Sequence, residues 1–260
     1  MTTFAQSLRI QGRVINALLM REVITRFGRE NLGVLWLVAE PMVFTLGVTA
    51  FWYAAKLNHG SAIPIVAFAI TGYSSVLLWR NTVNRANGGI QSNLSLLYHR
   101  NVRVIDVFIS RIIIEMAGAT GSFLVLAVFF TLIEQIDAPV DPLMVLAGWG
   151  MLAWFGASLA IVIGAATAYS EIVERVWGPV SYLIFPLSGA AFMVDWVPPA
   201  MQEVVLYMPM VHGVEMLRDG YFGDIVRTHY DIGYVALVNL VLTLLGLVLL
   251  RDAAKRTEMK

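Results

Sequence analysis

Hydrophobic residues gather along the chain into six long blocks that are separated by polar stretches. The blocks cover residues 34–55, 62–79, roughly 104–133, 143–168, 176–194 and 232–250. Each has about the 20 residues that a helix needs to cross the hydrocarbon core of a bilayer. The blocks are continuous rather than alternating, and a helix satisfies its own backbone hydrogen bonds. The pattern therefore predicts an all-α membrane protein with six transmembrane helices in residues 34–250.

The composition agrees with this fold class. Of the 260 residues, 58% are hydrophobic and only 14% are charged, whereas a soluble domain is about half apolar and about a quarter charged. The formal net charge is zero, so no overall basic field indicates nucleic acid as a partner. The chain contains no cysteine, which excludes disulfides and cysteine-ligated metals.

The distribution of lysine and arginine predicts the orientation. If the N-terminus is cytoplasmic, fourteen cationic residues fall in cytoplasmic stretches and three in outer loops. Cytoplasmic loops of membrane proteins carry this excess of positive charge. We therefore expect both termini in the cytoplasm, with residues 1–33 forming an interface region and residues 251–260 a tail.

The N-terminal region has the pattern of an amphipathic interfacial helix. Between residues 20 and 29 the apolar side chains share one helical face and most polar ones share the other: Met20, Val23, Ile24 and Phe27 against Arg21, Glu22, Thr25, Arg26 and Arg29. Upstream the apolar face is rotated by about half a turn. Either the helix bends near Leu19, or its second half faces something other than lipid. The mixed charge favours a protein partner over anionic headgroups alone.

Two further segments interrupt the pattern of simple spans. Residues 87–99 carry a short apolar stripe (Ile90, Leu94 and Leu97) and predict a short cytoplasmic helix, either a coupling element or an ordinary connection. Residues 195–224 are too apolar for a plain loop and are punctuated by Pro198, Pro199 and Pro209. They predict short outer re-entrant helices that shape an exit, or else interfacial helices with no transport role.

One span carries a ridge of small side chains. Gly156, Ala160, Gly164 and Ala168 recur at every fourth position of residues 143–168. Such a ridge lets two helix backbones approach closely, so this span is expected to pack tightly against a neighbour.

Motifs for catalysis are missing from the sequence. There is no glycine-rich phosphate loop, because none of the three lysines follows a glycine. The four histidines lack metal-ligand spacing. A membrane protein with these features is more simply interpreted as a transporter than as an enzyme.

Three stretches resemble the ABC type-2 export permeases. "LLMREVITRFGRENLGVLWLVAEPM" is similar to the N-terminal signature of that family, "LSLLYHRNVRVIDVFISRIIIE" to its segment between spans two and three, and "YMPMVHGVEMLRDGYFGD" to its late motif. The motifs occur in the family's order along essentially the whole chain. The combination is most similar to the branch that exports capsular polysaccharide.

The resemblance implies a transport subunit, not an enzyme, in the bacterial inner membrane. It implies a homodimer that works with two copies of a separate cytoplasmic ATPase, with ATP and Mg²⁺ held by that partner and no cofactor on this chain. Membrane lipids, a polysaccharide substrate, which is expected to be lipid-anchored, and periplasmic export proteins would be the other partners. The implied contacts to the ATPase fall on the N-terminal helix and the helix after span two: Arg21, Glu22, Arg26, Asn93, Leu96, Tyr98 and His99.

A sugar polymer needs a path that offers stacking surfaces without a tight site. Aromatic candidates lie in the first and fifth spans: Phe44, Phe51, Trp52, Tyr53, Tyr182, Phe185 and Phe192. For Trp52 and Tyr53 an interfacial aromatic belt is the alternative. Glu40 is costly within a span, by about 2–4 kcal/mol, so it is expected to face the path or a basic partner, or to reach the cytoplasmic edge. Arg111 and Glu115 are expected to pair across one helical turn.

Two other functions remain open from the sequence. An ABC type-2 exporter could carry another cargo, such as O-antigen, teichoic acid or a drug. A membrane enzyme acting on lipid-linked sugars would need a cluster of acids and histidines, and the outer segment has the one candidate set: Asp195, Glu203, His212, Glu215 and Asp219.

Overall fold

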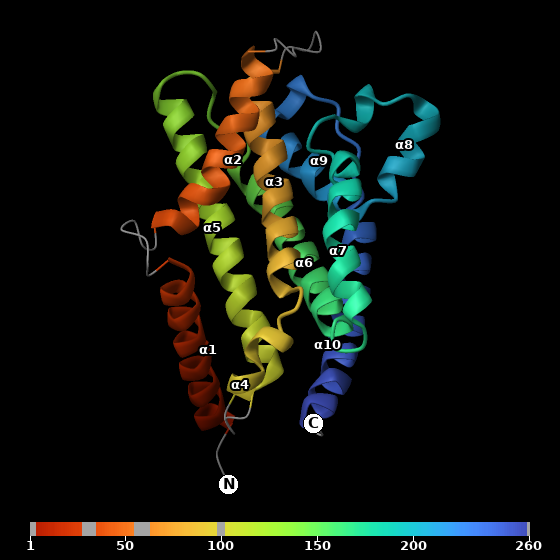
Figure 1. Cartoon of the computed structure of the whole chain (residues 1–260). Helices are drawn as coiled ribbons and strands as arrows, with labels where there is room; N and C mark the ends of the chain where they lie inside the picture. The colour runs from red at the N-terminus through yellow and green to blue at the C-terminus, as the bar shows by residue number, and fades with distance from the viewer. Residues whose placement is uncertain (1–3, 28–34, 55–62, 98–101, 259–260) are drawn as a thin grey trace.

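The computed structural model describes residues 4–27, 35–54, 63–97 and 102–258, and every regular element in these ranges is a helix (Figure 1). The longer helices are α1 (Phe4–Phe27), α2 (Leu35–Ala54), α3 (Ile65–Ala86), α5 (Val104–Leu132), α6 (Pro142–Ala166), α7 (Glu171–Ile184), α9 (Pro209–Phe222) and α10 (Ile232–Glu258). The shorter ones are η1 (Gln91–Asn93), α4 (Leu94–Leu97), η2 (Phe185–Leu187), η3 (Val194–Trp196), α8 (Pro199–Leu206) and η4 (Gly223–Ile225). The start of α1 and the end of α10 lie at one end of the molecule, and α8 lies at the other.

Four helices in the described part are long and apolar enough to cross a membrane: α2, α5, α6 and α10. They correspond to the predicted spans one, three, four and six. The predicted second span coincides with α3, which has 22 residues and runs on to Ala86. The fifth prediction differs most, because α7 ends at Ile184 and not at residue 194. Pro186 lacks a backbone N–H, and Gly189 has a φ of +81°, so the α-helix cannot continue through this stretch.

Helix α3 forms the centre of the bundle. All of its side chains from residue 66 to residue 80 are buried, and α2, α5 and α6 pack around it. The predicted ridge of small residues on α6 faces it. A Cβ atom on Gly156 would lie 2.8 Å from the Cα atom of Trp79, and one on Gly164 would lie 2.8 Å from the carbonyl oxygen of Ala86. The prediction of close packing is confirmed.

Helix α1 is continuous through Leu19, so the predicted bend is absent. Leu18 and Glu22 are buried where α1 packs against α5, whereas Met20 and Ile24 are exposed. The second half of the helix therefore turns part of its polar face toward the bundle. This is the alternative in which that half faces something other than lipid.

The last helix is longer than the sequence pattern predicted. Residues 251–258, expected to be a tail, continue α10. The Nε atom of Arg256 lies 3.2 Å from Asp252 one turn earlier, and the hydroxyl of Tyr169 donates to the same carboxylate at 2.8 Å. These contacts extend the helix beyond its apolar block.

The close approach of α6 and α3 can be tested with one methyl group. Gly156→Ala should destabilise the fold by about 1–3 kcal/mol, because the new Cβ meets the backbone of Trp79. Gly150→Ala on the same helix is the matched control, since its Cβ would meet nothing within 4 Å. Thermal unfolding of the purified variants in detergent checks the difference, and equal unfolding temperatures would contradict the packing described here.

Candidate functional site

A buried ion cluster joins α1 to the C-terminal end of α3 and the N-terminal half of α5. Glu22 of α1 receives a hydrogen bond from Arg85 of α3, and the Nε atom of Arg111 of α5 lies 3.5 Å from the same carboxylate. Arg85 also lies 3.9 Å from Glu115. The predicted pairing of Arg111 with Glu115 is therefore replaced, because Arg111 turns to Glu22 instead.

The cluster extends to the segment predicted as the coupling helix. Arg111 donates from Nη1 to the carbonyl oxygen of Arg85 at 2.9 Å and from Nη2 to the hydroxyl of Ser92 at 3.0 Å. Arg21 donates to the buried side chain of Asn93, whose amide donates to the carbonyl of Gly89 at 2.9 Å. Helix α1, η1, α3 and α5 are thus tied together by charged and amide side chains.

A glycine pair lets the chain turn from α3 into η1. Gly88 has a φ of +65°, which disfavours a side chain there. A Cβ atom on Gly89 would lie 2.8 Å from the carbonyl of Ala86 and 3.2 Å from Nη1 of Arg111. The local sequence therefore brings η1 close enough for Arg111 to reach Ser92.

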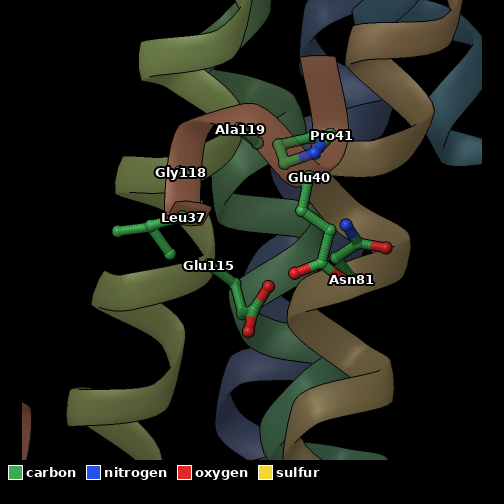
Figure 2. Close-up of a pocket in the computed structure, with 7 residues that line it drawn as sticks. All are labelled: Leu37, Glu40, Pro41, Asn81, Glu115, Gly118 and Ala119. Carbon is green, nitrogen blue, oxygen red and sulfur yellow. The ribbon is translucent and has the colours of Figure 1, made fainter. Parts of the chain in front are cut away.

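Glu40 lines a small pocket between α2, α3 and α5. Figure 2 shows Glu40, Asn81 and Glu115 around this pocket, with Leu37, Gly118 and Ala119 completing its wall. Helix α2 bends at Pro41, directly after Glu40 (Figure 2). Glu115 belongs both to this pocket and to the ion cluster, so the carboxylate of Glu40 lies next to the cluster.

Aromatic rings of α2, α3, η2 and η3 form a continuous chain. The rings of Trp52 and Phe68 stack with centroids 5.8 Å apart, Trp52 meets Tyr73 edge-on at 5.6 Å, and Tyr73 lies 5.6 Å from Phe185. Phe68 also lies 5.0 Å from Trp196 of η3. Figure 1 shows α2, α3 and α7 on the side toward the viewer, with α6 and α10 behind them.

The aromatic residues predicted to line the pathway fall into three groups. Phe44, Trp52, Tyr182 and Phe185 belong to this face: Phe44 lies 6.3 Å from Tyr73, and Tyr182 covers the guanidinium of Arg80. Phe51 and Tyr53 are exposed and form no ring contact with the described residues. Phe192 packs instead in a small outer cluster around Val194.

The predicted coupling residues are only partly covered by the structure. Arg21, Glu22 and Asn93 come together, and Leu96 is half-buried on α4. The side chain of Arg26, and Tyr98 and His99, lie outside the described residues.

Sequence reasoning did not identify several members of these sites: Phe68, Tyr73, Arg80, Arg85 and Trp196. A signal for some of them exists, because Tyr73, Arg80 and Asn84 recur at spacings of seven and four and so share one face of a helix. From the sequence alone, Arg80 and Arg85 are two of the fourteen cationic residues in the predicted cytoplasmic stretches.

A second buried charge cluster holds the outer segment. Arg218 of α9 is fully buried and donates to the carbonyl oxygens of Gly189, Ala190 and Phe192, each at 2.7 Å. Its guanidinium also lies 3.8 Å from the centroid of the Phe68 ring. Glu215 accepts from the backbone N–H of Val194 at 3.2 Å and of His229 at 3.0 Å. Both side chains therefore fix the loops on either side of α8 and α9.

The other polar residues of α9 have the same role. His212 accepts at Nδ1 from the backbone N–H of Asp231 at 2.9 Å, so its Nε2 donates to the carbonyl of Leu206 at 2.7 Å. Asp219 accepts from Thr228 at 3.0 Å and from the phenol of Tyr230 at 2.9 Å. Desolvation and the hydrogen bond to Asp219 raise the pKa of Tyr230 to about 12, so its hydroxyl stays a donor. Within the described residues no group of three or more acids and histidines has the arrangement of a metal site.

A profile of the ABC-2 type transporter family matches residues 13–222, which include every helix from α2 to α9. The chain belongs to this family. The match also covers the ion cluster, the aromatic chain and the outer charge cluster.

Relatives match over almost the full length. The chain is 45% identical over 257 residues to the capsule polysaccharide export inner-membrane protein BexB of Haemophilus influenzae, covering 99% of this chain and 97% of that protein. It is 46% identical over 257 residues to the capsule polysaccharide export inner-membrane protein CtrC of Neisseria meningitidis serogroup A, again covering 99% of this chain and 97% of that protein. The polysialic acid transport protein KpsM of Escherichia coli is 23% identical over 242 residues, covering 93% of this chain and 94% of that protein.

The ion cluster predicts a specific cost for neutralising Glu22. Glu22→Gln should destabilise the protein by about 1–3 kcal/mol, because Arg85 and Arg111 lose the carboxylate that compensates their charge. The control is Glu171→Gln, which removes an exposed carboxylate that pairs with Arg175 one turn away. Thermal unfolding of both variants is the measurement, and an equal effect would show that the cluster is not stabilising.

Proposed function

We propose that this chain is the permease subunit of an ABC exporter that carries capsular polysaccharide across the inner membrane. The observation that carries the proposal is the identity of 45% and 46%, over 99% of the chain, to relatives named as capsule polysaccharide export inner-membrane proteins. Four helices long and apolar enough to span a bilayer fit a multi-pass protein of that membrane.

Members of the ABC-2 family work with an ATPase partner, and this sequence carries no phosphate loop of its own. In the proposal a cytoplasmic ATPase, in two copies, holds the ATP and Mg²⁺ and contacts the end of the molecule formed by α1, η1 and α4. The link from Arg21 to Asn93 and the burial of Glu22 between Arg85 and Arg111 support this assignment. Glu22 then acts as a positioning residue, because it is buried within its own subunit.

The proposed topology has six spans, with α3 and α7 as the second and fifth. Both termini are cytoplasmic, since the start of α1 and the end of α10 lie at the same end of the molecule and carry the basic residues. Helices α8 and α9 then dip back from the outer side. The burial of α9 against α6, α10 and α3 supports this, because backbone at membrane depth must be covered by protein.

The polymer path is proposed to run between two copies of the chain, along the face formed by α2, α3 and α7. Helix α7 leaves Ile172, Val176, Tyr182 and Leu183 exposed, which a second copy can cover. Phe44, Tyr182 and Trp196 are exposed on this side of the subunit and offer stacking surfaces, whereas Trp52, Phe68 and Tyr73 are buried behind them.

Three of the five candidate residues for the rival assignment as a membrane enzyme have structural roles in the outer segment. His212, Glu215 and Asp219 use their acceptors to hold neighbouring backbone and side chains in the outer segment. An exporter of another cargo remains the second candidate, and the cellular test below separates the two.

Deletion of the gene in its native host tests the cargo directly. Capsule polymer should disappear from the cell surface and accumulate in the cytoplasm, and the wild-type gene should restore export. Immunodetection of the polymer in surface and cytoplasmic fractions is the measurement. Normal surface capsule in the deletion strain would overturn the proposed cargo.

The link between α1 and η1 should affect coupling rather than ATP hydrolysis itself. Arg21→Gln should lower the amount of polymer exported per ATP hydrolysed by about two- to thirtyfold, since it removes the donor to Asn93. Arg175→Gln, which removes an exposed cation on α7, is the control. Export from vesicles that contain the permease and its ATPase, measured beside phosphate release, checks the ratio; an unchanged ratio would contradict the coupling role.

A further inference from the structure

Arg80 is a buried cation for which the described part of the chain offers no anionic partner. Its side chain is 8% exposed and lies on α3, the central helix. Its Nε atom is buried without a hydrogen-bond partner, and no carboxylate or carbonyl of the described residues binds its other nitrogens. Charged residues at such depth in membrane proteins face the bundle interior or a water-filled path and mark functional sites.

The other arginines in the interior of the bundle are compensated. Arg85 and Arg111 share the carboxylate of Glu22, and Arg218 donates to three carbonyl oxygens. Arg80 differs from all three, so its burial is not explained by the internal network that explains theirs.

Along the contact between α3 and α7, Arg80 also differs from the neighbouring polar residues of α3. Asn87 donates to the carbonyl of Glu174 at 3.0 Å, and Asn84 accepts from the indole N–H of Trp177 at 2.8 Å. One turn further along α3, Arg80 meets only rings: its guanidinium carbon lies 4.1 Å from the centroid of Tyr182 and 5.8 Å from that of Phe185. Asn84 and Asn87 thus each have a polar partner on α7, whereas the contacts of Arg80 with α7 and η2 are with rings.

We propose that Arg80 and Tyr182 form a binding site for an anionic oxygen group of the exported cargo. The site lies beside the aromatic chain, because Tyr73 and Phe185 connect it to Trp52 and Phe68. Tyr182 is 67% exposed, so only one ring separates the buried guanidinium from the surface of the subunit. A small displacement of that ring opens the cation to a ligand.

The chemistry of the two side chains fits a charged glycan. A guanidinium presents its N–H donors in a planar fork that matches carboxylate or phosphate, and it stacks on aromatic faces while doing so. The phenol ring beside it can pack against the C–H surface of a sugar. One such contact guides a polymer without holding it, because the next charged repeat can replace the first.

This inference rests on the proposed function and adds the chemical class of the cargo to it. The anionic group belongs either to the sugars of the polymer or to a phosphate at its lipid anchor. Both sources offer the same oxyanion to Arg80, so two soluble probes are needed: a short sialic acid oligomer with its neutral methyl ester, and lysophosphatidic acid.

Binding to the purified complex of permease and ATPase tests the site. The wild-type complex should bind the acidic oligomer or lysophosphatidic acid, and Arg80→Gln should weaken that binding by about tenfold, as expected for loss of a charge-assisted hydrogen bond. Arg80→Lys keeps the charge but loses the planar fork, so its affinity should lie between those of the wild type and Arg80→Gln. The neutral ester should bind both proteins equally, which shows that the variant is folded; thermal unfolding provides a second check.

The outcomes separate the two sources and the alternative. Arg80-dependent binding of the acidic oligomer assigns the site to the sugars, and Arg80-dependent binding of lysophosphatidic acid assigns it to the anchor. Equal affinity of wild type and Arg80→Gln for both probes would overturn the proposal.

Complementation of the deletion strain distinguishes failure of the site from failure of the proposed function. If the wild-type gene restores surface capsule, the proposed function holds, and Arg80→Gln should then restore about tenfold less polymer. If the wild-type gene restores capsule and Arg80→Gln restores the same amount, only the anion site is wrong. If the deletion leaves the capsule unchanged, the proposed function itself has failed.

Discussion

The arrangement of the cytoplasmic end depends on one buried carboxylate. Glu22 lies between Arg85 and Arg111, which come from two different helices. A buried ion is tolerated only while its partners stay in place, because removing either leaves an uncompensated charge. Helix α1, α3 and α5 must therefore move together or lose the pairing. Arg111 also binds Ser92, so η1 belongs to the same rigid group.

The opposite end of α3 is held by the same kind of constraint. Arg218 is fully buried and fixes the backbone between Gly189 and Phe192, while its guanidinium covers the ring of Phe68. Helix α3 is thus held at both ends, and α7 packs beside it. Helix α7 is short, contains Pro179, and meets α3 along a seam of isolated polar and aromatic pairs. We infer that opening of the path moves α7 against a fixed α3.

The elements of the fold could be predicted where burial in lipid and burial in protein demand the same pattern. The spans at α2, α5 and α6, the presence of short helices within residues 195–224 and the small ridge of α6 all follow from the sequence. The charged residues could not be placed in this way. A polar helical face looks the same whether it turns to a partner or to charges of its own chain, so Glu22 gave no sign of its burial. Glu115 lies one helical turn from Arg111 in the sequence, and only the tertiary fold shows that Arg111 pairs with Glu22 instead.

The position of Arg80 on α3 links the ion cluster to the helix that covers the candidate anion site, α7. Arg80 and Arg85 lie on one continuous helix, so the ion cluster and the candidate anion site share a rigid support. Tyr182, which covers Arg80, lies on α7. Any movement of α7 relative to the cluster must therefore change the separation between the guanidinium and the ring. A cation that is covered in one position and open in another can accept an anionic group when the path opens and release it when the ring returns, which is what a conduit for a charged polymer requires.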